Sequence, residues 1–241
     1  MIYRFRPFDI RTISSLLKSE LYFSDPKDFN DPFDCQIPID FNPKALKNNL
    51  EFKNVKLPKE VYGNIHICCF SRERDNILQW SHYADSHRGI CLGFGEDNDI
   101  RKWNRSLIFV DYAKKMPKIN YFKILNELIK TDRNLYYDIN GRLNSRKLFT
   151  DLDAVIMIET VGTKQLEWKY EQEARILSST NGNLKYPKEL LKEIIFGFKL
   201  KNDDKIIIKG MISSAGYKSV KYFDCTPSFN NYKINVSEYV E

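Results

Sequence analysis

A stretch late in the chain decides the fold: Tyr170-Glu171-Gln172-Glu173-Ala174-Arg175-Ile176, in which charged side chains alternate with other residues. Alternation with period two is typical of a strand, and the pattern covers residues 170–178. It follows two segments of helical spacing between Pro117 and Thr163. Strands and helices are therefore grouped unevenly, without the regular alternation of a doubly wound sheet. The sequence predicts an α+β fold, with residues 1–241 as one domain of catalytic type and a helical insertion at about 117–163.

Other strands are predicted on both sides of this stretch. Residues 2–6 alternate apolar and basic side chains, which places Arg4 and Arg6 on one face of a half-buried strand. Asp9 then caps a helix. Further strands are expected at residues 21–24, 65–70, 89–94, 106–112, 193–198 and 219–223. Further helices are expected at residues 42–60, 76–84 and 202–215.

Composition limits the classes of function. The chain has 42% hydrophobic and 29% charged residues, as ordinary globular proteins do. It contains no apolar run of the roughly 18 residues needed to span a bilayer and no apolar segment of the signal-peptide type at its start, so we expect a cytoplasmic protein without a membrane partner. Five cysteines without a Cys-x-x-Cys spacing predict reduced core residues. The net charge of +6 favours an anionic partner such as nucleic acid or a nucleotide.

The carboxylate pair Glu171 and Glu173 is the best candidate for chemistry. In an extended strand both side chains share a face with Arg175, about 7 Å apart. One carboxylate could stabilise an oxocarbenium-like sugar cation while the other orients a nucleophile. The alternative is that either one forms a salt bridge with Arg175 or Lys169 on an exposed face of the sheet.

A second polar segment follows the strand that ends at Ser71. Ser71 could donate a hydrogen bond to a ligand, and Trp80 or Tyr83 could stack on a planar ring, although aromatic residues of this kind often belong to a core. The sequence lacks both glycine-rich nucleotide fingerprints, so phosphates would have to be held by Arg4 or Arg6.

Two further functions are compatible with the residues. The order of acidic residues followed by Glu167 and Lys169 resembles the spacing by which many nucleases hold a divalent metal, with Asp34, Asp151 or Asp153 as additional ligands. The other is a non-catalytic module that binds a nucleotide or nucleic acid through aromatic and basic side chains.

Several short motifs occur in order along the chain: Tyr3-Arg4-Phe5-Arg6, Leu21-Tyr22-Phe23-Ser24, Phe29-Asn30-Asp31-Pro32-Phe33-Asp34, Cys69-Phe70-Ser71, Trp80-Ser81-His82-Tyr83-Ala84, Gly89-Ile90-Cys91-Leu92-Gly93-Phe94 and Trp168-Lys169-Tyr170-Glu171-Gln172-Glu173-Ala174-Arg175. Taken in this order, over roughly residues 1–180, they resemble a bacterial family known as domain-of-unknown-function family 2971.

More distantly, the order of an arginine strand, a strand ending in serine and a late Glu-x-Glu is similar to that of ADP-ribosyltransferases. This resemblance implies a split mixed or antiparallel sheet and a mono-ADP-ribosyltransferase that uses NAD as its substrate. Arg4 or Arg6 would bind NAD, Ser71 would order the nicotinamide pocket, Glu173 would hold the ribose and Glu171 would position the acceptor. The implied NAD site is completed by Tyr83, Trp80, His82, Asn30 and Asp31, with no metal.

The resemblance also implies partners. The acceptor would be an intracellular macromolecule, with nucleic acid favoured slightly over protein because of the positive charge. A role as a toxin or anti-phage effector would add an antitoxin as a partner.

Overall fold

The computed structural model describes residues 1–40, 65–140 and 142–240, and the chain forms two compact units. The first unit comprises Met1–Asp28, Ile65–Val110 and Glu167–Glu241, and the second comprises Phe29–Asn64 and Asp111–Leu166. The predicted helical insertion at 117–163 lies within the second unit. The helix predicted at residues 42–60 lies outside the described residues.

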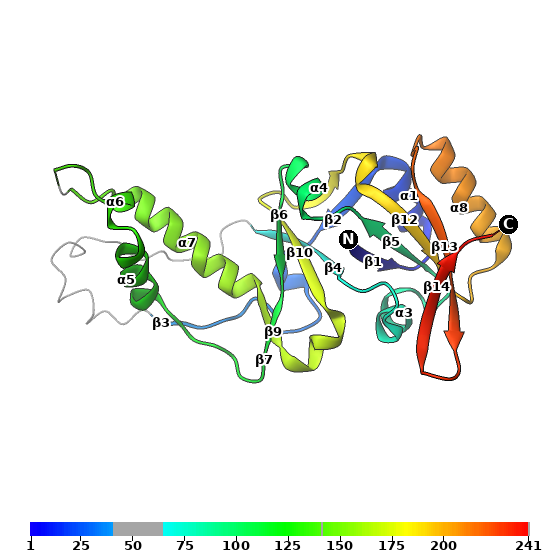
Figure 1. The fold of residues 1–241 in the computed structure, drawn as a ribbon, viewed down its shortest axis with the longest axis horizontal. Helices are drawn as coiled ribbons and strands as arrows, with labels where there is room; N and C mark the ends of the chain where they lie inside the picture. The colour runs from blue at the N-terminus through cyan, green and yellow to red at the C-terminus, as the bar shows by residue number, and fades with distance from the viewer. Residues whose placement is uncertain (41–64, 141, 241) are drawn as a thin grey trace. The chain divides into compact units, whose positions relative to one another are not determined.

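A mixed eight-stranded sheet forms the centre of the first unit (Figure 1). β12 and β13 are parallel, and the other neighbouring strands are antiparallel. This arrangement confirms the predicted α+β class, whereas its closer likeness to ADP-ribosyltransferases stays a prediction. In spatial order the strands are β14 (Lys233–Glu238), β13 (Lys221–Ser228), β12 (Leu191–Phe196), β5 (Ile90–Phe94), β1 (Ile2–Arg6), β4 (His66–Ser71), β10 (Glu173–Ser178) and β6 (Ser106–Phe109).

A small antiparallel ladder and several short helices complete the first unit. The ladder joins β2 (Glu20–Phe23) to β11 (Gly182–Lys185). The short helices are α4 (Asp97–Lys102) and three 3-10 turns, η1 (Pro26–Asp28), η3 (Leu166–Glu171) and η4 (Lys188–Leu190).

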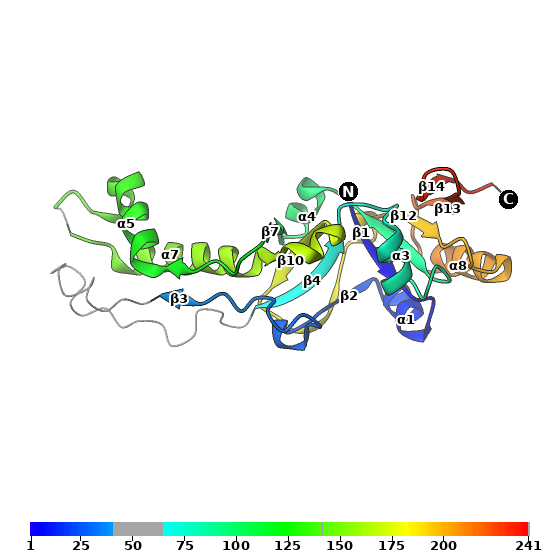
Figure 2. The same ribbon diagram turned by 90° about the horizontal axis from the view of Figure 1, so that it is seen from below.

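The two faces of the large sheet have separate apolar clusters. Leu16 of α1 (Ile10–Lys18) and Ile208 of α8 (Asn202–Ser214) belong to the cluster that contains Phe70 of β4. Trp80 of α3 (Ile77–Tyr83) belongs to the cluster that contains Phe5 of β1. Helices therefore cover both faces of the large sheet, which Figure 2 shows from a second direction.

The central strand β5 is buried along its whole length. Its sequence Ile90-Cys91-Leu92-Gly93-Phe94 is continuously apolar, as expected of a strand that is covered on both faces. Gly89 precedes it at a close approach of two chain segments, where an added Cβ would collide with the carbonyl oxygen of Arg6. The glycine that the sequence placed here is therefore required by sterics.

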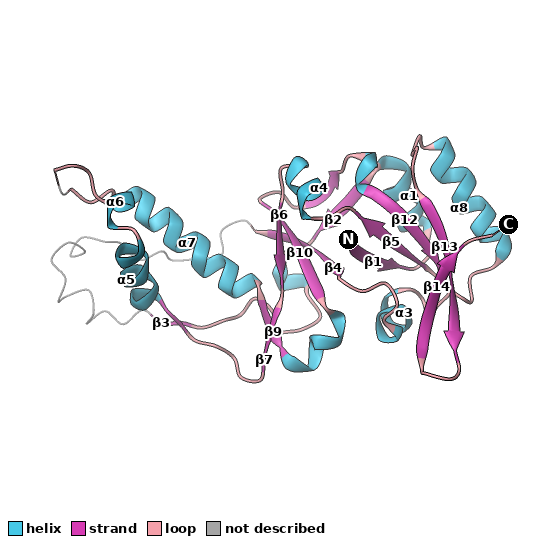
Figure 3. Cartoon of the chain, in the orientation of Figure 1, coloured by secondary structure: helices cyan, strands magenta, loops and turns pink. Residues whose placement is uncertain are grey.

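The second unit is mainly helical (Figure 3). Tyr121, Leu125, Leu148, Leu152 and Ile156 form the centre of its apolar cluster. None of the helices in the described part of the chain is both long and apolar enough to cross a membrane. The elements of this unit are β3 (Ile39–Asp40), β7 (Asp111–Ala113), β8 (Ile119–Asn120), α5 (Tyr121–Thr131), α6 (Arg133–Tyr136), α7 (Ser145–Val161) and β9 (Thr163–Gln165).

The predicted continuous strand over residues 170–178 is wrong at its beginning. Residues 166–171 form η3, and β10 begins only at Glu173. Between them Gln172 has a φ of 45°, in the left-handed region that side chains disfavour. Glu171 therefore does not share a strand with Glu173, and the alternation that paired them does not apply.

Candidate functional site

The strand registers place the predicted site residues on opposite faces of the large sheet. Tyr3 of β1 and Glu173 of β10 are both paired with Ser71 of β4. Residues directly opposite each other in neighbouring strands point to the same face, and successive residues of one strand point to opposite faces. Ser71 and Glu173 therefore share one face, whereas Arg4 and Arg6 point to the other.

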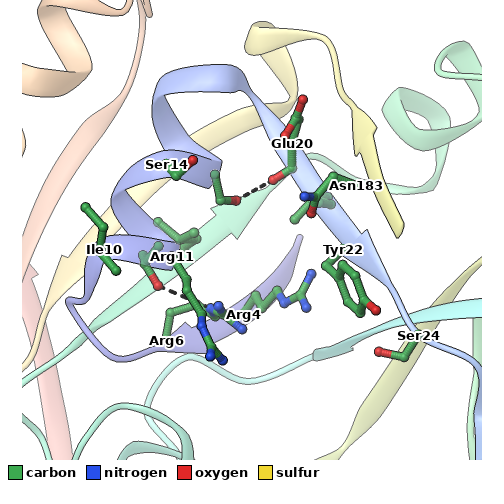
Figure 4. Close-up of a pocket in the computed structure, with 13 residues that line it drawn as sticks. Arg4, Arg6, Ile10, Arg11, Ser14, Glu20, Tyr22, Ser24 and Asn183 are labelled. Carbon is green, nitrogen blue, oxygen red and sulfur yellow. Dashed lines mark hydrogen bonds between the residues drawn. The ribbon is translucent and has the colours of Figure 1, made fainter. Parts of the chain in front are cut away.

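The face that carries the two arginines is hollowed into a pocket of about 640 Å³. We call it the arginine pocket. Figure 4 shows the guanidinium groups of Arg4, Arg6 and Arg11 and the Tyr22 ring gathered in this hollow. The lining residues are Arg4, Arg6, Ile10, Arg11, Thr12, Ser14, Ser15, Glu20, Leu21, Tyr22, Ser24, Leu92 and Asn183.

Local structure explains how Arg11 and Tyr22, which sequence reasoning did not assign to a site, reach this pocket. Asp9 caps α1 by accepting a hydrogen bond from the backbone N–H of Thr12 at 2.8 Å, which starts the helix just before Arg11. In β2 the side chains of Leu21 and Phe23 are buried, so the alternation turns Tyr22 outward. The ladder with β11 pairs Tyr22 with Asn183.

The pocket is strongly positive. Burial lowers the pKa of the Arg6 guanidinium from its ordinary value, and the positive charge of Arg4 lowers it further. The Arg4 guanidinium contacts the Cys68 sulfur and lies 5.7 Å from the centre of the Phe70 ring. In the described part of the chain no ion pair joins Arg4, Arg6 or Arg11 to a carboxylate, although the Asp9 charge acts on Arg6. Like charges held together in this way favour a bound anion.

The opposite face carries a buried polar cluster around Glu171. The Tyr83 hydroxyl donates a hydrogen bond to Oε1 of Glu171 at 2.8 Å. The backbone oxygen of Glu171 accepts from Ser71 Oγ at 2.8 Å and from Gln79 Nε2 at 3.3 Å. Ser71 Oγ also accepts from the backbone N–H of Glu73. The Ser71 hydroxyl therefore fixes two backbone segments, which is an alternative to its predicted contact with nicotinamide.

Glu173 forms a buried ion pair with Arg175. Nε and one terminal nitrogen of Arg175 donate to the two carboxylate oxygens of Glu173 at 2.8 and 3.0 Å. The side chain of Arg175 is 0% exposed and that of Glu173 is 4% exposed. The salt bridge that the sequence offered as an alternative is thus present, but it lies in the interior and not on an exposed face.

Asn76 connects α3 to this cluster, which leads to a testable prediction. Its Oδ1 accepts from the backbone N–H groups of Leu78 and Gln79, and its Nδ2 donates to the backbone oxygen of Tyr170. We expect Asn76→Ala to lower the free energy of unfolding by about 1 to 2 kcal/mol because both the cap and this donor are lost. Asn76→Ser, which keeps a capping oxygen without placing a second acceptor against the Tyr170 carbonyl, should cost less in urea unfolding. Equal costs for the two variants would contradict the capping role.

The predicted single cleft containing Arg4 or Arg6, Ser71 and Glu173 is wrong, because the strand registers separate the arginines from the other two residues by the sheet. The predicted stacking role of Trp80 also needs correction. Trp80 is 0% exposed and packs edge-on against Phe5 at 5.2 Å, so neither face of its ring is open to a ligand.

The remaining predicted residues have varied surroundings. His82 is exposed, with its ring 6.3 Å from that of Tyr83 and 6.4 Å from that of Tyr170. Asn30 and Asp31 begin the second unit, where Asn30 is exposed and buried Asp31 accepts from the backbone N–H of Phe33. Their predicted binding of a cofactor stays a prediction.

Two residues of the nuclease alternative, Asp34 and Asp151, already have ion-pair partners. The buried pair of Asp34 and Lys164 has an N–O distance of 3.6 Å, and Asp151 pairs with Lys147 at 3.1 Å. Glu167 and Lys169 lie in η3 of the first unit. Within the described ranges, no group of three or more His, Cys, Asp or Glu side chains is placed to hold a metal ion. No observation therefore favours the nuclease over the arginine pocket.

Comparison with known proteins supports the family resemblance over part of the chain. Residues 79–176 match the model of a family described as "Protein of unknown function (DUF2971)". This match confirms the predicted resemblance to that family; it begins within α3 and includes β5 and the segment from Glu171 to Arg175. No curated protein and no solved structure matches the chain.

Proposed function

We propose that the first unit binds a phosphorylated small molecule of the nucleotide class in the arginine pocket. The observation that carries this proposal is the convergence of three arginines, none paired with a carboxylate among the described residues, in one hollow of about 640 Å³. A guanidinium group donates two parallel hydrogen bonds to phosphate oxygens. The volume lies within the roughly 300–1,000 Å³ of small-molecule sites.

The remaining lining of the pocket suits the other parts of a nucleotide. Tyr22 is 48% exposed, so its ring can stack on a base. The Asn183 amide, opposite Tyr22 in the ladder, can both donate and accept hydrogen bonds at a base edge. Hydroxyl groups of Ser14 and Ser24 add further polar contacts in the same hollow. These groups favour a nucleotide over inorganic phosphate alone.

NAD-dependent ADP-ribosyl transfer is a narrower proposal than nucleotide binding. The arginine pocket supports it only by offering guanidinium groups to a dinucleotide pyrophosphate. Its proposed catalytic carboxylate, Glu173, lies on the opposite face of the sheet and is paired with Arg175. We therefore propose that the first unit binds a nucleotide, and NAD is one ligand to be tested. A role as toxin or defence effector depends on the result with NAD.

Titration calorimetry on the full chain tests the proposal with inorganic phosphate, ADP and NAD. We expect ADP or NAD to bind more tightly than phosphate, and Arg4→Gln to weaken that binding by about ten- to a hundredfold, because a charged hydrogen bond contributes about 1.5–3 kcal/mol. The matched control is Arg88→Gln, since Arg88 is 56% exposed and pairs with Asp85 outside the pocket.

Two outcomes would contradict nucleotide binding: no binding of ADP or NAD at millimolar concentration, or equal binding by the Arg4→Gln and Arg88→Gln variants. Release of nicotinamide from NAD, measured in the same samples, decides the narrower proposal. NAD that binds without losing nicotinamide would leave binding as the function.

A further inference from the structure

A second basic hollow adjoins the arginine pocket. It has a volume of about 540 Å³ and is lined by Leu17, Lys18, Ser19, Glu20, Lys185, Tyr186 and Lys188. Glu20 lines both hollows, so they meet at this residue. The surface that could contact one ligand is therefore longer than the arginine pocket alone.

Two elements run from one hollow to the other. Arg11, near the start of α1, lines the first hollow, and Lys18, its last residue, lines the second. In the ladder of β2 and β11, the pair Tyr22 and Asn183 lines the first hollow, and the next outward-facing pair, Glu20 and Lys185, reaches the second. A helix and a strand ladder thus border a continuous surface.

The charge of this surface is strongly positive. Its basic residues, which we call the basic path, are Arg4, Arg6, Arg11, Lys18, Lys185 and Lys188, and among the described residues Glu20 is the one acidic residue that lines either hollow. Six positive charges against one negative charge give these two hollows a net charge of +5, which is close to the net charge of +6 for the whole chain. A positive charge that follows a path of this length fits a polyanion better than a single phosphate group.

The length of the basic path and the exposed Tyr22 ring indicate which kind of polyanion fits it. Lys18 lies seven positions after Arg11 in α1, a rise of about 10 Å at 1.5 Å per residue. Stacked nucleotides rise about 3.4 Å each along the axis of one strand, so about three nucleotides cover this length. A basic groove beside an exposed aromatic ring, here Tyr22, is the usual arrangement for binding single strands through base stacking.

We infer that the basic path binds single-stranded nucleic acid, with one nucleotide in the arginine pocket and the following phosphates along Lys18, Lys185 and Lys188. This inference rests on the proposed binding of a nucleotide and extends it to a longer ligand. Tyr22 stacks on the base of the first nucleotide, while the lysines contact phosphates without reading the base sequence.

Fluorescence anisotropy with labelled ADP and with labelled single-stranded octanucleotides of thymidine and of uridine tests the inference on the full chain. We expect an octanucleotide to bind at least about tenfold more tightly than ADP at equal salt, because more phosphates are neutralised. Lys18→Gln with Lys185→Gln should weaken octanucleotide binding about tenfold, lower its salt dependence by about one unit of log–log slope, and leave ADP binding unchanged.

Two further variants make the test independent of protein stability. Glu20→Gln removes the one carboxylate that lines the path and should tighten octanucleotide binding severalfold, a gain that misfolding does not produce. The matched control replaces Lys201 and Lys221 with Gln, since both are exposed and line neither hollow. This control should change binding little.

Equal affinities for ADP and the octanucleotides, together with no effect of the Lys18 and Lys185 substitutions, would overturn the inference while nucleotide binding stands. Absence of binding to ADP and to both octanucleotides would instead overturn the proposed function as well.

Discussion

Arg175→Met should lower the free energy of unfolding by about 3–5 kcal/mol, because it leaves the buried carboxylate of Glu173 without the guanidinium group that donates two hydrogen bonds to it. Removal of one partner from a buried ion pair costs far more than removal of an exposed pair, since the remaining charge stays out of water. Urea unfolding followed by circular dichroism measures the loss. A loss of this size would show that Glu173 holds the sheet together, whatever else it does.

The control for Arg175 is an arginine in an exposed pair. Arg88→Met removes the pair with Asp85, in which both side chains are at least half exposed, and should cost far less than Arg175→Met. Replacing both partners, with Glu173→Leu and Arg175→Met together, should restore part of the stability that the single change removes, because no unpaired charge is left. If Arg175→Met costs no more than Arg88→Met, the pair has no structural role.

Trp80→Ala should lower the free energy of unfolding by about 3–5 kcal/mol, the usual cost of truncating a large buried aromatic side chain. Trp80 is 0% exposed, contacts the Phe5 ring and donates its indole N–H to the backbone oxygen of Arg74 at 2.8 Å. Trp80→Phe should cost less, since most of the apolar area remains and only the hydrogen bond is lost. Urea unfolding of the two variants and the wild-type chain gives both values.

Neighbouring His82 provides the control for Trp80. It is exposed on the same helix, and His82→Ala should change the free energy of unfolding by no more than about 0.5 kcal/mol. Binding of ADP by the Trp80→Phe variant separates a core role from a ligand role. A variant with unchanged stability and weakened binding would restore the predicted stacking of Trp80 on a ligand.

Local patterns were sufficient to predict many of the elements. The spacing of apolar residues predicted two helical segments between Pro117 and Thr163, where α5 and α7 lie. Asp9 was identified as a cap because its side chain acts on the backbone only three residues away. The alternation in residues 2–6 correctly placed Arg4 and Arg6 on one face. All of these depend on interactions within a single turn or strand.

Contacts between distant segments could not be predicted in the same way. Whether Glu173 shares a face with Arg4 depends on the registers of β1, β4 and β10, which are separated by long stretches of chain. Order along the sequence carries no information about a register of this kind. Tyr22 and Asn183 were missed for the same reason, since only their pairing in the β2–β11 ladder brings them to one hollow.

The left-handed backbone of Gln172 has a consequence for natural variation in chain length. It ends η3 and determines which residues of β10 point to each face of the sheet. Glu173 and Arg175 point to one face, while Ala174 and Ile176 join the apolar cluster on the other. Inserting one residue between Gln172 and Glu173, or deleting Gln172, would exchange the two faces and direct the two charges into that apolar cluster. Related chains should therefore keep the spacing between these elements fixed, even where their loops differ in length.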